Sequence, residues 1–210
     1  MSLPRLVVVD YGMGNLASVA KALERAGAQV RLTDDPGAVR AAAAVVLPGV
    51  GAFRDAMARL EQSGLGEAVR ERIAAGAPFL GVCLGLQLLF DSSGEGGRYP
   101  GLGVLPGSVE RLETDLKVPH IGWNELYWRE AGAGMAAGLP APAYVFFVHS
   151  YAARPKDLKS VAATTDYGGE VVAAVARDQV WAVQFHPEKS SALGLRLLAN
   201  FVALAGGEGA

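Results

Sequence analysis

The most constraining feature of this sequence is a regular alternation of short apolar runs with amphipathic segments in its first half. Leu6–Val9 is an apolar, β-branched run, which is typical of a strand buried on both faces of a sheet. Asn15 can cap a helix that continues to about Arg25, because apolar residues recur on one face of this segment. Strands that alternate with helices imply right-handed crossovers and therefore a mostly parallel sheet.

The alternation continues as far as Phe90. The expected strands are Gln29–Leu32, Ala44–Leu47 and Phe79–Val82, and the expected helices lie near Ala38 and at Phe53–Glu61, Glu67–Ala75 and Leu84–Phe90.

The second half has a different pattern, in which short apolar runs are joined by turns that contain glycine or proline. Strands are expected at Val109–Leu112, Asn124–Tyr127, Tyr144–Val148, Ser160–Ala163, Val171–Ala176 and Val180–Gln184. A last helix is expected at Ser191–Leu204, and Gly132–Gly138 is predicted to be a loop. Because no linker or repeat interrupts the pattern, residues 1–210 are predicted to form one α/β domain with antiparallel strands late in the chain.

The composition excludes several classes of function. A net charge of −2 without a basic stripe gives little support for binding nucleic acid or acidic membranes. A single cysteine cannot form an internal disulfide, and the first residues lack a signal-peptide pattern, so a reducing, cytoplasmic location is expected. The uncharged stretch Ile73–Phe90 contains glycines and a proline that suit a strand, a turn and a helix better than a membrane span.

The segment Pro78–Gln87 places the cysteine between two glycines at an expected strand-to-helix junction. Gly81-Val-Cys83-Leu-Gly85 has the Gly-x-nucleophile-x-Gly spacing of a nucleophile elbow. In such an elbow the nucleophile has a strained backbone, and glycines are needed where neighbouring chain passes close by. The start of the following helix would favour a thiolate, and the Leu84 N–H would point to the position where an oxyanion forms.

A cysteine nucleophile also needs a base, and His186 is the best candidate among the three histidines. It follows the expected strand Val180–Gln184, and the residue before a proline is held extended. In extended chain, residues two apart point the same way, so Glu188 can share a face with His186 and orient its imidazole. His120 and His149 have no acid two residues further on.

Both assignments have structural alternatives. Cys83 alone could be a small core residue, as free cysteines often are, and His186 alone could be a structural histidine at a strand end. The glycines around Cys83 and the His186-Pro-Glu188 sequence together favour catalysis. No metal site is expected, because no histidine pair has ligand spacing, and no cofactor is expected.

Taken together, Gly81–Gln87 and His186–Glu188 resemble the triad-type (class I) glutamine amidotransferases. Further segments are similar to the glutaminase subunits of imidazole glycerol phosphate synthase, namely Asp10–Asn15, Leu47–Phe53, Val118–Asn124, His149–Tyr151 and Phe185–Ser190. The resemblance extends from about Leu6 to Phe201. It implies a three-layer, flavodoxin-like fold with a mostly parallel central sheet, and glutamine hydrolysis that supplies ammonia for histidine biosynthesis.

The resemblance also implies roles for individual residues. Cys83 would attack the side-chain carboxamide of glutamine and form a glutamyl thioester. His186, oriented by Glu188, would pass a proton to the departing ammonia. The N–H of Leu84 and an N–H of the Gly49–Gly51 backbone would form the oxyanion hole.

The amino-acid end of glutamine would be held by Gln87, by the Gly49–Gly51 backbone and by the backbone near Ser150 and Tyr151. The two glycines that flank Val50 permit a peptide flip. The isolated chain is therefore expected to be nearly inactive until a partner's ligand shifts the population toward a complete oxyanion hole.

The resemblance implies a second subunit, because no other part of the chain is suited to making imidazole glycerol phosphate. A (β/α)₈-barrel cyclase would receive the ammonia and convert a phosphoribulosyl-formimino-AICAR nucleotide to imidazole glycerol phosphate and AICAR. The candidates for the partner interface or the ammonia gate are Met13, Asn15, Trp123, Phe146 and Lys189. Phe146 stands where the family can have tyrosine, so this position offers the gate an aromatic ring without a hydroxyl.

Two other functions stay open at this point. Another triad glutaminase, such as the one that serves pyridoxal phosphate synthesis, is disfavoured by the segment Pro119–Asn124. A non-catalytic binding subunit on the same fold is disfavoured by the complete set of Cys83, His186 and Glu188.

Overall fold

A computed structural model describes residues 3–207, so residues 1–2 and 208–210 of the expected domain lie outside the described part. Within residues 3–207 the central sheet has nine strands in the order β2-β1-β3-β4-β13-β12-β11-β8-β9. In that order they are Gln29–Thr33, Arg5–Val9, Ala44–Gly49, Phe79–Cys83, Val180–Val183, Glu170–Arg177, Val161–Asp166, His120–Trp128 and Ala143–His149. The first five pair in parallel and the others join in antiparallel pairs. This arrangement confirms the predicted α/β fold with antiparallel strands late in the chain.

The carboxyl ends of the parallel strands β1, β3, β4 and β13 meet at one edge of the sheet. The register pairs Gly49 of β3 with Cys83 of β4, and Val82 of β4 with Val183 of β13. The chain that follows each strand therefore begins at the same edge, where open parallel sheets bind their ligands. In this way the topology brings the cysteine close to the segment that contains His186.

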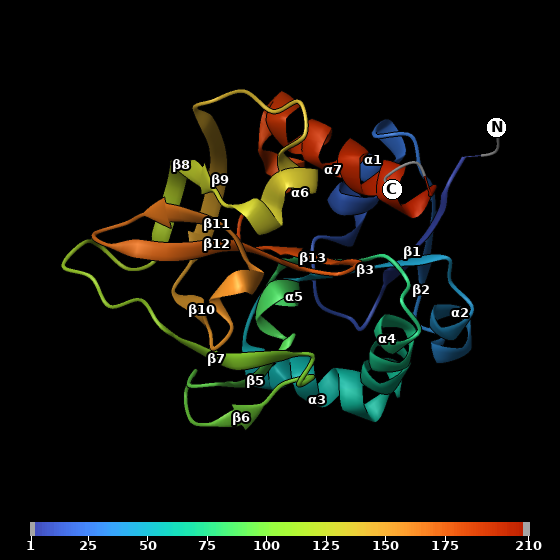
Figure 1. Ribbon diagram of the computed structural model, residues 1–210. Helices are drawn as coiled ribbons and strands as arrows, with labels where there is room; N and C mark the ends of the chain where they lie inside the picture. The colour runs from blue at the N-terminus through green and yellow to red at the C-terminus, as the bar shows by residue number, and fades with distance from the viewer. Residues whose placement is uncertain (1–2, 208–210) are drawn as a thin grey trace.

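Helices cover both faces of this sheet (Figure 1). The helices on one face are α1 (Leu16–Arg25), α6 (Ala133–Ala136) and α7 (Ser191–Ala205), and those on the other are α2 (Pro36–Arg40), α3 (Phe53–Gln62), α4 (Leu65–Ala74) and the short α5 (Leu84–Gln87). The three layers that the resemblance implies are therefore present.

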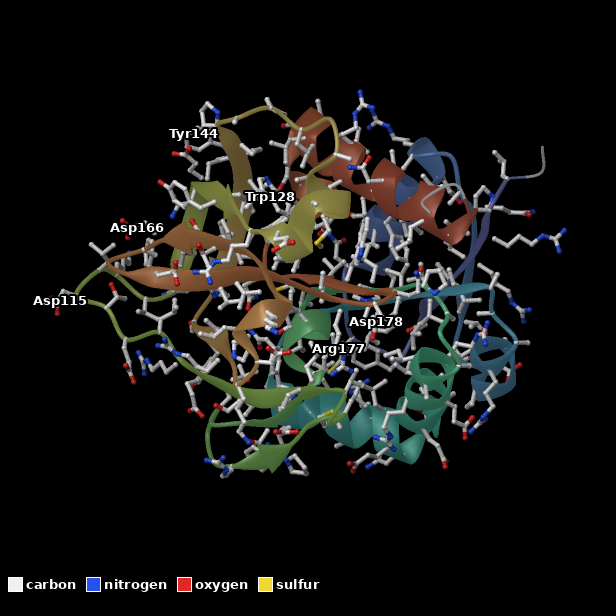
Figure 2. The ribbon with its side chains drawn as sticks, viewed as in Figure 1. Asp115, Trp128, Tyr144, Asp166, Arg177 and Asp178 are labelled. Carbon is white, nitrogen blue, oxygen red and sulfur yellow. The ribbon has the colours of Figure 1, made fainter. Side chains whose placement is uncertain are left out.

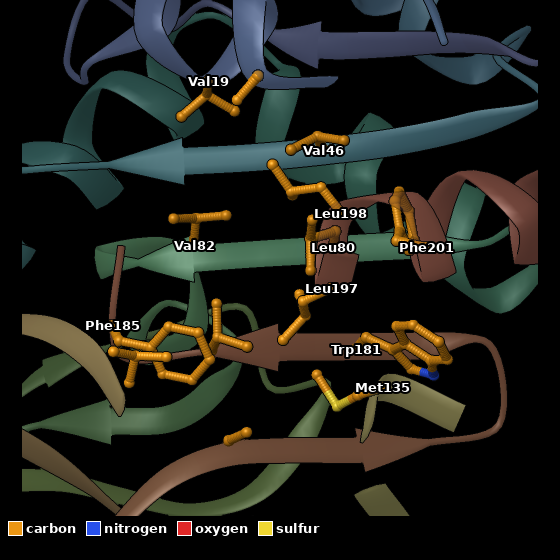
Figure 3. Packing of buried hydrophobic residues seen from close by; sticks show 14 of the residues in the cluster. Val19, Val46, Leu80, Val82, Met135, Trp181, Phe185, Leu197, Leu198 and Phe201 are labelled. Atoms are coloured by element: carbon orange, nitrogen blue, oxygen red, sulfur yellow. The ribbon is translucent and has the colours of Figure 1, made fainter. Parts of the chain in front are cut away.

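Each face of the sheet has its own hydrophobic core, because successive side chains of a strand point to opposite faces. In β1, Leu6 and Val8 belong to the core under α1 and α7, while Val7 and Val9 belong to the core on the other face. Figure 3 shows the first core, in which Phe201 of α7 lies among the side chains of the sheet. The two cores hold the carboxyl edge of the sheet in place.

A second, smaller sheet lies beside the first, in the lower part of Figure 1. Its order is β10-β7-β5-β6, and the strands are Tyr151–Pro155, Leu105–Arg111, Phe90–Ser93 and Tyr99–Pro100. Only β7 was expected from the sequence. The others are short and contain no apolar run of strand length, so their local patterns carry little strand signal.

Two local predictions were wrong. The helix expected at Leu84–Phe90 ends at Gln87, and Phe90 begins β5. A short apolar run fits a buried helix or a buried strand equally well, and tertiary pairing decides between them. The loop expected at Gly132–Gly138 contains the whole of α6, which is anchored by the fully buried Met135. Short 3₁₀ helices complete the chain at Glu130–Gly132, Leu158–Ser160 and Pro187–Lys189. No helix in the described part of the chain is long and apolar enough to cross a membrane.

Candidate active site

Cys83 lies at a sharp turn between β4 and α5. Its backbone has φ 55° and ψ −109°, a left-handed φ that non-glycine residues rarely adopt. Such strain persists only where the surrounding structure enforces it, and it is concentrated at functional sites. The strained elbow predicted from the sequence is therefore confirmed.

The two glycines that flank the cysteine are required by close backbone approaches. A Cβ at Gly85 would overlap the carbonyl oxygen of Leu47 in β3. A Cβ at Gly81 would lie 2.8 Å from the carbonyl oxygen of Gly85. Because both obstacles are backbone atoms, a side chain at either position would push α5 away from the sheet and move the sulfur.

His186 follows β13 and is held by strand β9. The N–H of His186 donates to the carbonyl oxygen of Phe146 at 3.0 Å. The N–H of Phe146 in turn donates to Oγ of Ser190, whose hydroxyl donates to the carbonyl oxygen of His186 at 2.7 Å. These bonds fix the backbone on both sides of the imidazole.

His186 and Glu188 are a buried, hydrogen-bonded pair. Nδ1 of His186 donates to Oε1 of Glu188 at 2.8 Å, and both side chains are only 2% exposed. The expected extended geometry is wrong in detail, because β13 ends at Val183 and Glu188 lies in a 3₁₀ turn. The turn at Pro187 still brings the carboxylate to the imidazole, so the predicted orienting contact is present.

The electrostatics of His186 depend on both of its neighbours. Burial by itself lowers the pKa of His186, but the Cys83 sulfur and the Glu188 carboxylate outweigh burial and raise this pKa to about 9. Nε2 of His186 is buried and has no hydrogen-bond partner within residues 3–207, although Cys83 is close enough to affect the pKa. The imidazole therefore favours its charged form beside the sulfur.

Cys83 and His186 open into one cavity of about 280 Å³. The cavity is lined by Val50, Gly51, Cys83, Leu84, Gln87, Glu95, Val148, His149, Ser150, Tyr151 and His186. It thus unites most of the residues that the sequence predicted for catalysis, the oxyanion hole and substrate binding. Gly49 lies beside it, paired with Cys83.

The loop after β3 borders this cavity. Val50 is 40% exposed, and Gly51 has a φ of 97°. A Cβ at Gly49 would overlap the hydroxyl of Tyr11, so this position also requires glycine. The Tyr11 hydroxyl is buried and has no hydrogen-bond partner in the described part of the chain.

The five interface candidates lie at different places. The sequence predicts that Asn15 caps α1, but its side chain makes no capping hydrogen bond to that helix. Its amide N–H instead donates to Oε1 of Glu188 at 3.4 Å. Met13 lies against Gly51. Trp123 of β8 is 52% exposed and packs edge-on against Phe146 at 6.2 Å between ring centroids.

The last interface candidate, Lys189, is exposed and directly follows Glu188 in the sequence. Tyr144, labelled at the outer strand β9 in Figure 2, is half exposed and adds to the aromatic surface around Trp123. Tyr144 therefore lies on β9, the strand that also holds the His186 backbone, and Trp123 lies on the neighbouring strand β8.

Sequence reasoning missed three residues at the site. Gln184 is fully buried and contacts the Cys83 sulfur at 3.7 Å through its side-chain amide. Glu95 lines the cavity, and its Oε2 accepts the N–H of Phe53 at 2.8 Å. His149 also lines the cavity although it has no acid partner. The sequence offered a signal for two of them: Gln184 is a glutamine at the end of an apolar run, and Glu95 is an acid in a glycine-rich loop.

Comparison with known proteins defines the class. The family model for class-I glutamine amidotransferases matches residues 7–205. A solved glutamine amidotransferase superposes with a TM-score of 0.75 at 25% identity, covering 95% of this chain and 98% of the other. The chain belongs to the class-I glutamine amidotransferase family.

Its curated relatives narrow the assignment within that class. The imidazole glycerol phosphate synthase subunit HisH of Moorella thermoacetica is 53% identical, with 93% of each chain covered. The HisH subunit of Thermosynechococcus vestitus is 51% identical over 97% of this chain and 99% of its own. Both of these relatives are HisH subunits of imidazole glycerol phosphate synthase, and the chain belongs with them to that family of subunits.

Proposed function

We propose that this chain is the glutaminase subunit of imidazole glycerol phosphate synthase, which hydrolyses glutamine to glutamate and ammonia in histidine biosynthesis. The observation that carries the proposal is the cavity in which the strained Cys83 meets His186, itself bonded to Glu188 at 2.8 Å. A nucleophile, a base and an orienting acid are the parts that thioester chemistry requires. The HisH relatives support the same assignment.

In the first half of the reaction, the Cys83 thiolate attacks the carboxamide carbon of glutamine. A carbon–sulfur bond forms and the carbonyl oxygen becomes an oxyanion. When the tetrahedral intermediate collapses, the carbon–nitrogen bond breaks, and the charged His186 gives its proton to the leaving ammonia. The raised pKa of His186, about 9, keeps that proton available at neutral pH.

In the second half, water hydrolyses the glutamyl thioester. His186, now neutral, takes a proton from the water, whose oxygen attacks the thioester carbon. The carbon–sulfur bond breaks, glutamate leaves and Cys83 returns to its thiolate form. Glu188 holds Nδ1 of the imidazole throughout, so Nε2 stays turned toward the reacting atoms.

Polar groups around the cavity are suited to the amino-acid end of glutamine. Both N–H groups of the Gln87 amide are already bound, one to the Tyr151 carbonyl and one to Gln184, each at 3.0 Å. Gln87 therefore contacts the substrate through its oxygen alone. Glu95, a carboxylate fixed by the N–H of Phe53, would pair with the α-ammonium, and the backbone at Ser150 would meet the carboxylate.

The oxyanion would be stabilised by the N–H of Leu84 and by an N–H of the Gly49–Gly51 loop. The loop borders the cavity, and the side chain of Val50 in it is exposed. We propose that rotation of a peptide in this loop completes the oxyanion hole, and that partner binding shifts the population toward the rotated state.

A (β/α)₈-barrel cyclase is the proposed partner, and this chain would pass it ammonia for the conversion of the phosphoribulosyl-formimino-AICAR nucleotide to imidazole glycerol phosphate and AICAR. The support is the HisH name of the relatives and the exposed Trp123 beside Phe146. Met13, Asn15 and Lys189 complete the proposed interface. We place the complex in the cytoplasm, since the single cysteine is its nucleophile and no disulfide is needed.

The test is glutamine hydrolysis by this chain alone, with the barrel cyclase, and with the cyclase plus its nucleotide. We expect little activity alone and a rise at each step, with Cys83→Ser inactive throughout. Equal rates in all three mixtures would contradict control by the partner.

A glutamine-like electrophile separates this proposal from a non-catalytic binding subunit. Mass spectrometry should find one adduct, on Cys83, in the complex and none in Cys83→Ser. Absence of labelling even with the cyclase present would favour the binding subunit.

A further inference from the structure

Gln184 is a buried polar residue that the triad mechanism does not use. It follows β13, two residues before His186, and its side chain is completely buried. Its Nε2 lies 3.7 Å from Sγ of Cys83, and its Oε1 lies 3.0 Å from Nε2 of Gln87. A buried amide between a nucleophilic sulfur and a second amide needs a functional account, because buried polar groups are costly unless paired.

The orientation of both amides is determined by a backbone carbonyl. The carbonyl oxygen of Tyr151 can only accept, so the Gln87 amide must turn its NH₂ group toward it. The second hydrogen of that NH₂ group points to Gln184, which must therefore present its oxygen to Gln87. The NH₂ group of Gln184 is then left facing the sulfur.

The same carbonyl connects this network to a pair of buried histidines. Nδ1 of His149 donates to the Tyr151 oxygen at 2.9 Å, which leaves Nε2 of His149 as an acceptor for Nδ1 of His120 at 3.1 Å. The amide of Asn124 bonds the carbonyl oxygen of Asp166 at 2.8 Å and lies 3.4 Å from Nε2 of His120. Asp166 is labelled at the outer end of β11 in Figure 2.

Hydrogen bonds run in one direction through His120 and His149, because both imidazole rings are neutral. Burial lowers the pKa of each ring, to about 4 for His120 and about 4 for His149. A neutral ring has one donor and one acceptor nitrogen, so every bond from Asn124 to Tyr151 has a defined polarity. The network therefore has carbonyl acceptors at Asp166 and Tyr151, and its last donor points to Cys83.

We propose that Gln184 is a positioning residue for the nucleophile, which holds the Cys83 sulfur in place and favours its thiolate by donating an amide N–H to it. A donor aimed at the charged form stabilises that form, and a buried bond to a charged group is stronger than a neutral one. The charged His186 also lies beside the sulfur but must release its proton during turnover. Gln184 cannot titrate, so it supports the thiolate in every protonation state of the base. The proposal rests on the proposed function and adds a positioning side chain beside its catalytic triad.

The test uses the full chain, in which Cys83 is the only cysteine, so that alkylation by iodoacetamide reports on this sulfur alone. Two variants remove the donor in different ways. Gln184→Met keeps the length of the side chain without any donor. Gln184→Glu keeps its shape and, when ionised, turns a negatively charged acceptor oxygen toward the sulfur. Thr165→Val is the matched control, since it removes a buried hydroxyl that has no hydrogen-bond partner within the described residues.

For Gln184→Met we expect the alkylation rate at neutral pH to fall roughly tenfold, which corresponds to a shift of the pH profile by about one unit to higher pH. The rate at high pH should match the wild type, because the thiolate itself is unchanged. Gln184→Glu should shift further, and Thr165→Val should not shift.

Superimposable pH profiles for the wild type and a folded Gln184→Met variant would overturn the proposal. Should the methionine variant fold poorly by circular dichroism, Gln184→Leu, which also removes the donor without adding a charge, takes its place. Failure of the proposed function itself would give a different result, in which the wild-type complex is not labelled at Cys83 by a glutamine-like electrophile.

Discussion

His186 donates a 2.8 Å hydrogen bond from Nδ1 to Oε1 of Glu188, and both side chains are almost fully buried. A buried pair of this kind leaves Nε2 as the one nitrogen of the ring that can reach the cavity. The side chain of Asn15 bonds the same carboxylate oxygen at 3.4 Å, so the acid is itself supported from the segment after β1. Because Glu188 fixes the imidazole, the direction in which Nε2 points is defined, and this is the direction of the proposed proton transfer.

The pKa of His186 provides the first prediction. NMR titration of the imidazole should give a value near 9 in the wild type, because the Cys83 sulfur and Glu188 outweigh the lowering by burial. In Cys83→Ala this pKa should fall, since burial then opposes Glu188 alone. His120 and His149, near 4, are internal controls. An unchanged His186 titration in Cys83→Ala would show that the sulfur does not interact with the ring.

The same shift predicts how stability depends on alkaline pH. The folded pKa of His186 is raised above its ordinary value of 6.5, so its stabilising contribution is complete below about pH 6.5 and is lost as the pH rises through about 9. Urea unfolding across this window should therefore show a smaller loss of stability in His186→Gln than in the wild type. Parallel curves for the two proteins would contradict the expectation.

The buried histidines predict the opposite behaviour on the acid side. Their folded pKa values, about 4, lie below the ordinary 6.5, so the unfolded chain binds protons first. The contribution of these histidines to the free energy of unfolding should be complete above about pH 6.5. It should fall as the pH drops toward 4, by about 1.4 kcal/mol for each pKa unit per histidine. His120→Phe keeps the stacking on Phe147 and Tyr167 and should flatten this dependence in urea unfolding. An equally steep acid limb in that variant would rule out His120 as its source.

Gly85 is predicted to tolerate no side chain. In Gly85→Ala the new methyl group would meet the backbone of Leu47, and we expect a loss of roughly 1–3 kcal/mol in the free energy of unfolding together with loss of Cys83 labelling. Gly66→Ala in α4 is the matched control, because a Cβ there has only ordinary contacts at 3.5 Å. That control should be neutral or gain up to about 1 kcal/mol. Thermal unfolding of both variants measures the difference. Equal changes in melting temperature would contradict a steric requirement for glycine at position 85.

Trp123 is predicted to matter for association and not for folding. Its indole is 52% exposed, so Trp123→Ala should leave the melting temperature nearly unchanged. Aromatic residues at the centre of an interface commonly contribute about 2 kcal/mol or more, so binding to the cyclase should weaken by at least about tenfold. Calorimetric titration measures this, with Leu158→Ala, an exposed apolar residue elsewhere in the chain, as the control. Unchanged affinity in Trp123→Ala would place the interface on another surface.

Much of the fold could be predicted because its signals are local. The alternation of Leu6–Val9 with the helix that follows Asn15 depends on residues close together in the chain, and β1 and α1 have nearly the expected bounds. The elbow at Cys83 and the acid two residues after His186 are also local patterns, and both are present in the structure. The end of α5 at Gln87 could not be predicted, because Phe90 pairs with Leu105 of the second sheet.

Sequence alone determined which residues could do chemistry: a cysteine that needs glycines on both sides, and a histidine with an acid two positions later. Tertiary structure decided that they meet, through the parallel pairing of β4 with β13, strands about a hundred residues apart. It also decided the place of Gln184, which in sequence is one polar residue after an apolar strand and in space is the amide that faces Cys83. The physical reason is that hydrogen bonds between distant segments depend on sheet register and burial, and neither is encoded in any short stretch of the chain.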